Sequence, residues 1–145
     1  MAAPAQYPQS LPGVRKKIAK ITAAKTIDVA DCGTLFMVSN PTGGTYVVTL
    51  PSPSTAGVGW HCKFVNSNVS GNMTNIVRID GAASTMAAVV VDGGSTTANI
   101  DGAAANQFVN FLAASLHGDW CEVWTDGTYW YAEAWSGINA GMTTT

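Results

Sequence analysis

Turn residues divide this chain at short, regular intervals, which limits every regular element to a few residues. From Thr26 onward, apolar runs of about four to eight residues recur between Gly, Pro, Asn and Asp. The clearest run is Thr45–Leu50, and Pro51 follows it directly, where proline cannot donate to a strand ladder. Short runs at eight-to-twelve-residue spacing predict an all-β fold. We expect an antiparallel β-sandwich or barrel, jelly-roll-like, of about eight to ten short strands.

Three segments allow more detailed predictions. In the segment 59–66, Trp60, Cys62 and Phe64 alternate with more polar residues, which predicts one shared face. Asp126-Gly127 lies between two aromatic strand candidates and predicts a hairpin with a two-residue turn. Alanine-rich stretches at 82–88 and 103–105 are compatible with a helical turn, although no apolar stripe of 3.6-residue period accompanies them.

The composition agrees with a β protein and excludes several other classes. Only 11% of the 145 residues are charged, against about 25% in an average soluble protein. The chain has no apolar run of about 20 residues, so we expect no membrane span. Its N-terminus lacks the pattern of a secretion signal, so we expect synthesis in a cytoplasm. So few charges suit a surface that other protein partly covers.

The charges are divided between two parts of the chain. The first 25 residues hold five cations and no acid, namely Arg15, Lys16, Lys17, Lys20 and Lys25. The remainder holds two cations and nine acids, a net charge of −7. This division predicts a basic, proline-rich, extended N-terminal arm over residues 1–25, a single β domain over 26–136 and a flexible C-terminal tail over 137–145. We expect the arm to dock on an acidic protein surface; the alternatives are a solvated tail and contact with nucleic-acid phosphates.

Residues suited to catalysis or metal binding show no recognisable motif. Cys32, Cys62 and Cys121 are far apart, and we expect buried free thiols. His61 and Cys62 are adjacent, so in a strand their side chains point to opposite faces. His117 stands in no known catalytic pattern either. We therefore expect no enzyme activity, no catalytic residues, no metal and no cofactor.

Tryptophan and tyrosine gather in the C-terminal hairpin. Strand parity places Trp120 and Trp124 on one face with Glu122. The aromatic candidates for a subunit interface or a glycan-stacking platform are Trp60, Trp120, Trp124, Tyr129, Trp130 and Trp135. Core packing and cross-strand aromatic pairs are the alternative interpretation. Acidic side chains surround this hairpin, so we expect no nucleic acid there.

Five segments together resemble a module that is common in virion proteins of tailed bacteriophages. They are Asp31–Phe36, Gly44–Pro53, Gly59–Asn66, Gly118–Trp124 and Asp126–Tyr131. The second contains the motif Leu-Pro-Ser-Pro, and the last two contain an aromatic strand followed by Asp-Gly-Thr-Tyr-Trp. The resemblance implies a β-rich, often trimeric protein of a head-decoration, head-fibre or tail-fibre type. It implies no catalytic residues.

A chain of 145 residues fits a decoration protein better than a long fibre. The resemblance therefore implies a homotrimeric capsid decoration (cement) protein on the virion surface, made in the host cytoplasm. Its partner would be the major capsid protein, whose subunits it would bridge to stabilise the shell. No direct nucleic-acid contact and no membrane are expected. The alternative is a carbohydrate-binding or receptor-binding module on a virion surface or tail fibre, with a host-surface glycan as its ligand.

Overall fold

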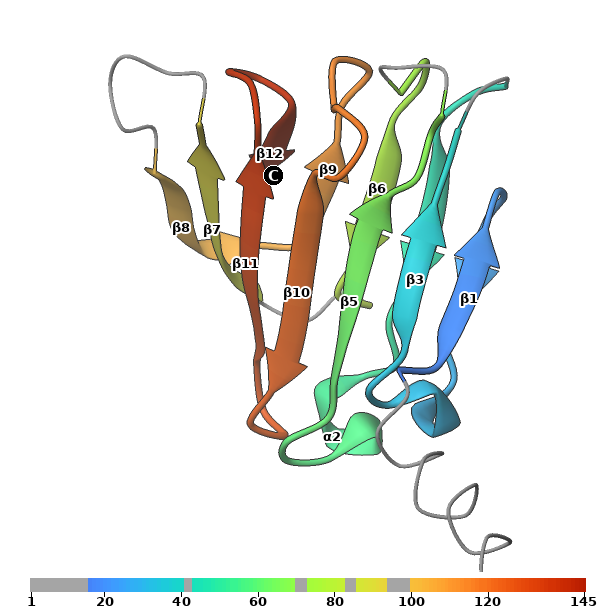
Figure 1. Cartoon of the computed structure of the whole chain (residues 1–145). Coiled ribbons are helices and arrows are strands. Elements are labelled where there is room, and N and C mark those ends of the chain that lie inside the picture. Colours follow the sequence, from blue (N-terminus) through green and yellow to red (C-terminus); the bar gives the residue numbers. More distant parts are fainter. Residues whose placement is uncertain (1–15, 41–42, 70–72, 83–85, 94–99) are drawn as a thin grey trace, which may run out of the picture.

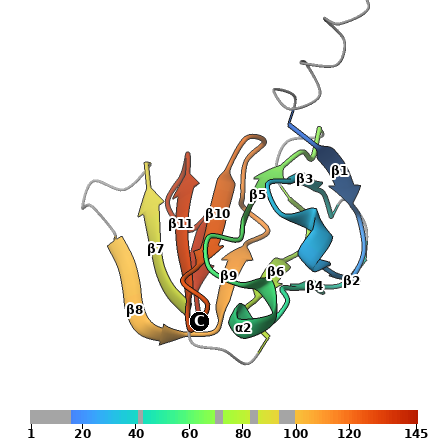
Figure 2. The ribbon, with the colours of Figure 1, turned by 90° about the horizontal axis from the view of Figure 1, so that it is seen from below.

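A computed structural model describes residues 16–40, 43–69, 73–82, 86–93 and 100–145 of the chain. Two sheets form the two layers of a sandwich-like fold (Figures 1 and 2). The first sheet contains, in spatial order, β1 (Ile18–Ile21), β3 (Leu35–Val38), β5 (His61–Asn66), β10 (Trp120–Thr125), β11 (Trp130–Ser136), β7 (Met86–Asp92) and β8 (Ile100–Asn106). The second contains β12 (Met142–Thr144), β9 (Phe108–Phe111), β6 (Val77–Asp80), β4 (Tyr46–Thr49) and β2 (Lys25–Thr26).

The chain enters the two sheets alternately over its first six strands. β1, β3 and β5 are parallel neighbours in the seven-stranded sheet. β2, β4 and β6 are parallel neighbours in the five-stranded sheet. The later strands add mostly antiparallel pairs. The β10–β11 hairpin lies between β5 and β7, and β11 pairs with β7 in parallel. The all-β, sandwich-like prediction is confirmed, whereas antiparallel pairing throughout and closure into a barrel were wrong for the described strands. Alternation fixes which face a residue occupies, but not the direction of the neighbouring strand.

The C-terminal hairpin is confirmed with a longer turn than predicted. Thr125 pairs with Trp130, so four residues connect the strands instead of two. The Asp126 carboxylate accepts hydrogen bonds from the backbone N–H groups of Thr128 and Tyr129, each at 2.8 Å. These bonds hold the turn from its first residue, and they explain how a four-residue connection stays ordered. The alanine-rich segments form strands β7 and β8 where the structure describes them, not helical turns.

In the described ranges, two short helical segments connect strands. The 3₁₀ helix η2 (Val29–Asp31) follows β2, and Asp28 caps it by accepting from the Ala30 N–H at 2.8 Å. The single-turn helix α2 (Pro53–Ala56) follows β4 at one end of the sandwich (Figure 1). Its first residue is a proline, whose missing N–H is not needed at that position. The strand therefore ends before Pro51, as predicted, and Pro53 begins the helix.

The core lies between the two sheets and contains the large apolar side chains. Phe36 and Phe64 stack with ring centroids 5.3 Å apart. Trp60 and Trp130 meet edge to face with centroids 5.5 Å apart. The predicted common face of the segment 59–66 is confirmed, because Trp60, Phe64 and the Cys62 between them are all buried.

A buried carboxylate joins three chain segments at the start of β10. Asp119 is 1% exposed and accepts four hydrogen bonds. One oxygen accepts from the Ser115 hydroxyl at 3.0 Å, the Leu116 N–H at 2.8 Å and the Ser136 hydroxyl at 2.9 Å. The other accepts from the Gly137 N–H at 2.9 Å. Four donors compensate for the loss of hydration of this charge.

Both terminal regions contribute strands where they are described. Residues 18–21 and 25–26 of the predicted arm are β1 and β2, paired with β3 and β4. Residues 142–144 of the predicted tail are β12, paired with β9. Residues 1–15 of the arm lie outside the described residues.

Candidate functional site

The outer face of the seven-stranded sheet is unusually apolar. In a two-layer sandwich, residues that alternate with core residues normally face water and are polar. Here the outward positions of five strands are mostly aliphatic or aromatic and are half-buried or exposed. We call these side chains the outer patch: Leu35, Met37, Val65, Trp120, Trp124, Tyr131, Trp135, Val89 and Val91. A contiguous apolar surface of this kind indicates a binding surface.

Cross-strand pairs order the centre of the outer patch. On the outer side of β10 and β11, an aromatic pair, a carboxylate pair and a second aromatic pair follow one another. These are Trp120–Trp135, Glu122–Glu133 and Trp124–Tyr131. The rings of the last pair stack with centroids 6.2 Å apart and planes 14° apart. Two like charges directly opposite each other are unfavourable, so this arrangement favours binding of a cation.

Lys63 of β5 already supplies a cation at one end of this arrangement. Its Nζ lies 3.7 Å from the ring centroid of Trp120. The same atom lies 3.9 Å from a carboxylate oxygen of Glu122. An ammonium group over an indole face is attracted by the ring quadrupole, and more strongly where water is partly excluded. Among the described residues, Glu133 has no comparable cation.

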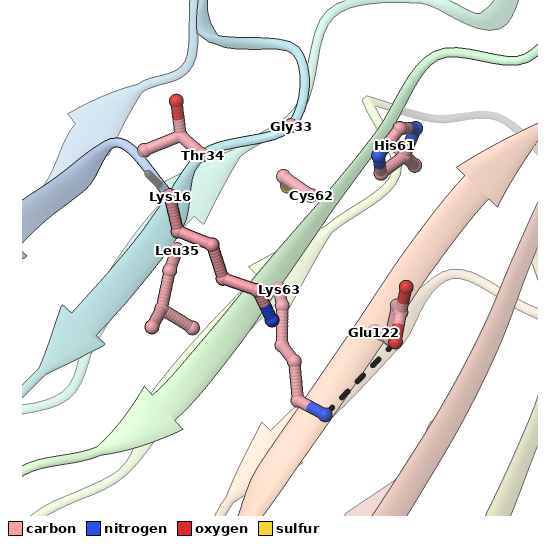
Figure 3. A pocket seen from close by; sticks show the side chains of 8 residues that line it. All are labelled: Lys16, Gly33, Thr34, Leu35, His61, Cys62, Lys63 and Glu122. Carbon is pink, nitrogen blue, oxygen red and sulfur yellow. Dashed lines mark ion pairs between the residues drawn. The ribbon is translucent and has the colours of Figure 1, made fainter. Parts of the chain in front are cut away.

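A shallow groove of about 140 Å³ lies beside this lysine (Figure 3). Its lining residues are Lys16, Gly33, Thr34, Leu35, His61, Cys62, Lys63 and Glu122. Figure 3 shows Lys16 extending along the groove toward Lys63, while Glu122 faces them from β10. Lys20 of β1 is also exposed and alternates with the buried Ile21. The half of the outer face from β1 to β5 is therefore basic.

The five predicted arm cations have different surroundings. Lys17 forms an ion pair with Asp31 at 2.8 Å, and this hydrogen bond holds the pKa of the Asp31 carboxyl below its usual value. Lys25 has its Nζ 5.4 Å from the ring centroid of Phe36. These two lysines are therefore engaged in contacts within the chain. Lys16 and Lys20 are exposed, and Arg15 lies outside the described residues.

The six predicted aromatic residues separate into two groups. Trp60 and Trp130 belong to the core, with exposures of 3% and 0%, and are not available to a partner. Trp60 also donates its indole N–H to the Val29 carbonyl at 2.8 Å. The other four reach the surface: Trp120, Trp124 and Trp135 in the outer patch, and Tyr129 in the β10–β11 turn. Sequence reasoning missed Lys63, because nothing in the sequence shows that β5 is the neighbour of β10.

The cysteines and histidines belong to no metal-binding group in the described part of the chain. Cys62 and Cys121 are buried as predicted, and burial raises the pKa of both thiols. Cys32 is exposed, because it follows η2 at the surface, so the prediction of three buried thiols was wrong for this residue. His61 points outward while Cys62 points into the core, as predicted.

The described residues hold neither a metal-binding cluster nor a membrane-spanning helix. No group of three His, Cys, Asp or Glu side chains lies close enough together to hold a metal ion within those ranges. No helix there is long and apolar enough to cross a membrane. No protein-family model, curated protein or solved structure matches this chain. The outer patch and its flanking charges are therefore the candidate site on which a function is argued.

Proposed function

We propose that this chain is a non-enzymatic virion structural protein, namely a capsid decoration protein that binds between major capsid protein subunits. The observation that carries the proposal is the apolar outer patch on a chain with only 11% charged residues. Exposed tryptophans and valines on the outer face of a sheet are typical of a surface that another protein covers. The resemblance of five segments to phage virion modules is the reason for proposing that the covering protein belongs to a phage capsid.

The proposed mechanism needs no chemical step. A protein that binds across neighbouring subunits binds only the assembled shell, so mass action stabilises the shell against disassembly. Copies arranged as homotrimers on the capsid surface would multiply the contacts made at each site. The exposed cations Lys16 and Lys20, with Arg15 before them, would provide attraction to acidic positions on the shell.

The proposal is tested by mixing the purified chain with empty phage capsids and measuring co-sedimentation and the melting temperature of the shell. We expect saturable binding and a higher melting temperature. Because β1 and β2 belong to the sheets, the arm is tested by deleting residues 1–15 and by the pair Lys16→Glu and Lys20→Glu. Both variants should remain folded and bind less. Undiminished binding would refute the role of the arm, and no binding by the full chain would refute the decoration function.

A carbohydrate-binding function is the second candidate, and one specific observation favours it. The stacked, nearly parallel rings of Trp124 and Tyr131 offer an aromatic surface against which a sugar ring can stack. The carboxylates of Glu122 and Glu133 follow immediately along the same strands and can accept hydrogen bonds from sugar hydroxyls. Titration of tryptophan fluorescence with host polysaccharide tests it. Saturable quenching that Trp124→Ala abolishes and Tyr129→Ala preserves would support a glycan site; no quenching would refute it.

A further inference from the structure

We propose that the outer patch is the surface on which one copy of this chain docks against a second copy. The inference deepens the proposed decoration function and rests on it for its biological meaning. Self-association, however, is measured without capsids, so the two proposals can fail separately.

The first step of the argument is the apolar content of the face. Four large side chains from three adjacent strands are each about two-fifths exposed. Val89 and Val91 on β7 are both 39% exposed, Trp124 on β10 is 40% exposed and Trp135 on β11 is 41% exposed. The strands already contribute their other faces to the core, so these side chains do not serve the packing between the sheets. Covering them would remove apolar area from water, which is the main driving force of protein association.

The second step is the distribution of charge across the same face. Lys16, Lys20 and Lys63 lie on the half that runs from β1 to β5. Glu122 and Glu133 lie on the half formed by β10 and β11. Two copies can meet so that the basic half of each faces the acidic half of the other. Every half of the two faces is then opposite a half of the other charge. A surface that holds both members of a charge pair is complementary to itself, as an interface between two copies related by a two-fold axis requires.

The third step is a contact that each copy makes internally. Lys63 places its ammonium over Trp120 and next to Glu122, which shows the geometry in which this surface holds a cation. The other end of the three cross-strand pairs on β10 and β11 presents a similar combination: the Trp124–Tyr131 stack lies beside Glu133. A lysine from a neighbouring copy can make the corresponding contact there.

The mixed charge of the face also selects the occupant. A nucleic acid or an anionic membrane requires a uniformly positive surface. A strongly basic peptide requires a uniformly acidic one. The outer face carries cations on one half and carboxylates on the other, with aromatic pairs on both sides of the carboxylate pair, which fits another copy of the same face best.

The apolar contribution is tested by light scattering and sedimentation velocity on the full chain over a wide concentration range. The wild-type chain should self-associate, and the double variant Trp124→Ala with Trp135→Ala should raise the dissociation constant at least about tenfold, as is usual for large aromatic anchors. Tyr129→Ala is the matched control, because Tyr129 is 49% exposed but lies in the turn, outside the patch. Its association should equal that of the wild type, and thermal melts establish that all variants are folded.

The charge pattern is tested by reversing one residue on each half, Lys20→Glu and Glu133→Lys. Each single variant should associate several-fold more weakly at low salt, and the two reversals in one chain should restore association. A mixture of the two single variants should co-assemble, which only contacts between copies can produce. A wild-type chain that stays monomeric at millimolar concentration, or reversals without effect, would overturn the inference. Glycan quenching by such a monomer would assign the face to the second candidate function, whereas self-association without capsid binding would refute decoration alone.

Discussion

Substitution of Asp119 by asparagine tests whether one buried carboxylate holds three chain segments together. In the wild type, a single oxygen accepts from Ser115, Leu116 and Ser136, and the other accepts from the N–H of Gly137. An asparagine amide of the same shape can keep its oxygen at the three-donor position. Its NH₂ group must then face the N–H of Gly137, so one acceptor becomes a donor that opposes another donor.

The magnitude follows from the bond that is lost and the groups that are left without a partner. A hydrogen bond to a charged group contributes about 1.5–3 kcal/mol, and a buried donor without an acceptor costs about 1–3 kcal/mol. The two contributions overlap, because they concern the same contact. We therefore expect the free energy of unfolding to fall by about 3 kcal/mol. For a chain of this length that corresponds to a melting temperature lower by about 6–12 °C.

The assay is urea unfolding and thermal melting at low protein concentration, where association between copies does not contribute. Glu133→Gln is the matched control, since it makes the same chemical change at an exposed carboxylate. It should change the free energy of unfolding by less than about 0.5 kcal/mol. If Asp119→Asn were as stable as this control, the four hydrogen bonds would not hold the segments together and the reasoning would be refuted.

Three further outcomes are expected. Gly141→Ala should destabilise the fold by about 1–3 kcal/mol in urea unfolding, because the added Cβ would collide with the Ser136 hydroxyl; wild-type stability would show that this contact relaxes freely. In the native chain a thiol reagent should modify only Cys32, and the two buried cysteines of β5 and β10 should react only after unfolding; three reactive thiols at once would contradict their burial. Because the folded pKa of Asp31 lies below 3.8, its pair with Lys17 stabilises the fold above about pH 4 and loses this effect as the pH falls through the folded pKa. Asp31→Asn should therefore be less stable than wild type by under about 1 kcal/mol at pH 7, with the difference shrinking toward pH 2; a difference independent of pH would contradict this assignment.

Strand faces were predictable from the sequence, whereas strand partners were not. Alternation along β10 correctly placed Trp120, Glu122 and Trp124 on one side, because side chains in a strand alternate regardless of its neighbours. The parallel pairing of the first six strands was missed, because short strands carry no signal for the direction of a neighbour. The antiparallel hairpin was found because its turn residues lie between the two paired strands in sequence.

For the candidate site too, the sequence identified residues but not their surroundings. The aromatic residues of the hairpin were identified, but Trp60 and Trp130 proved to be core residues. Only the tertiary structure distinguishes a tryptophan that faces the other sheet from one that faces water. The contact of Lys63 with β10 joins residues about 60 positions apart, and no local pattern reports such a pair.

The alternation of the first six strands between the two sheets has a consequence for how chains of this kind can vary in length. Each passage through both layers forms one structural turn, which adds one strand to each sheet beside the strand of the previous turn. Insertion of one complete turn would lengthen both layers by one strand and preserve the local contacts of the others, as in repeat proteins. Growth or shortening by whole turns is thus the modular route open to this architecture. It would change the width of the half formed by β1, β3 and β5 while leaving the β10–β11 half unchanged.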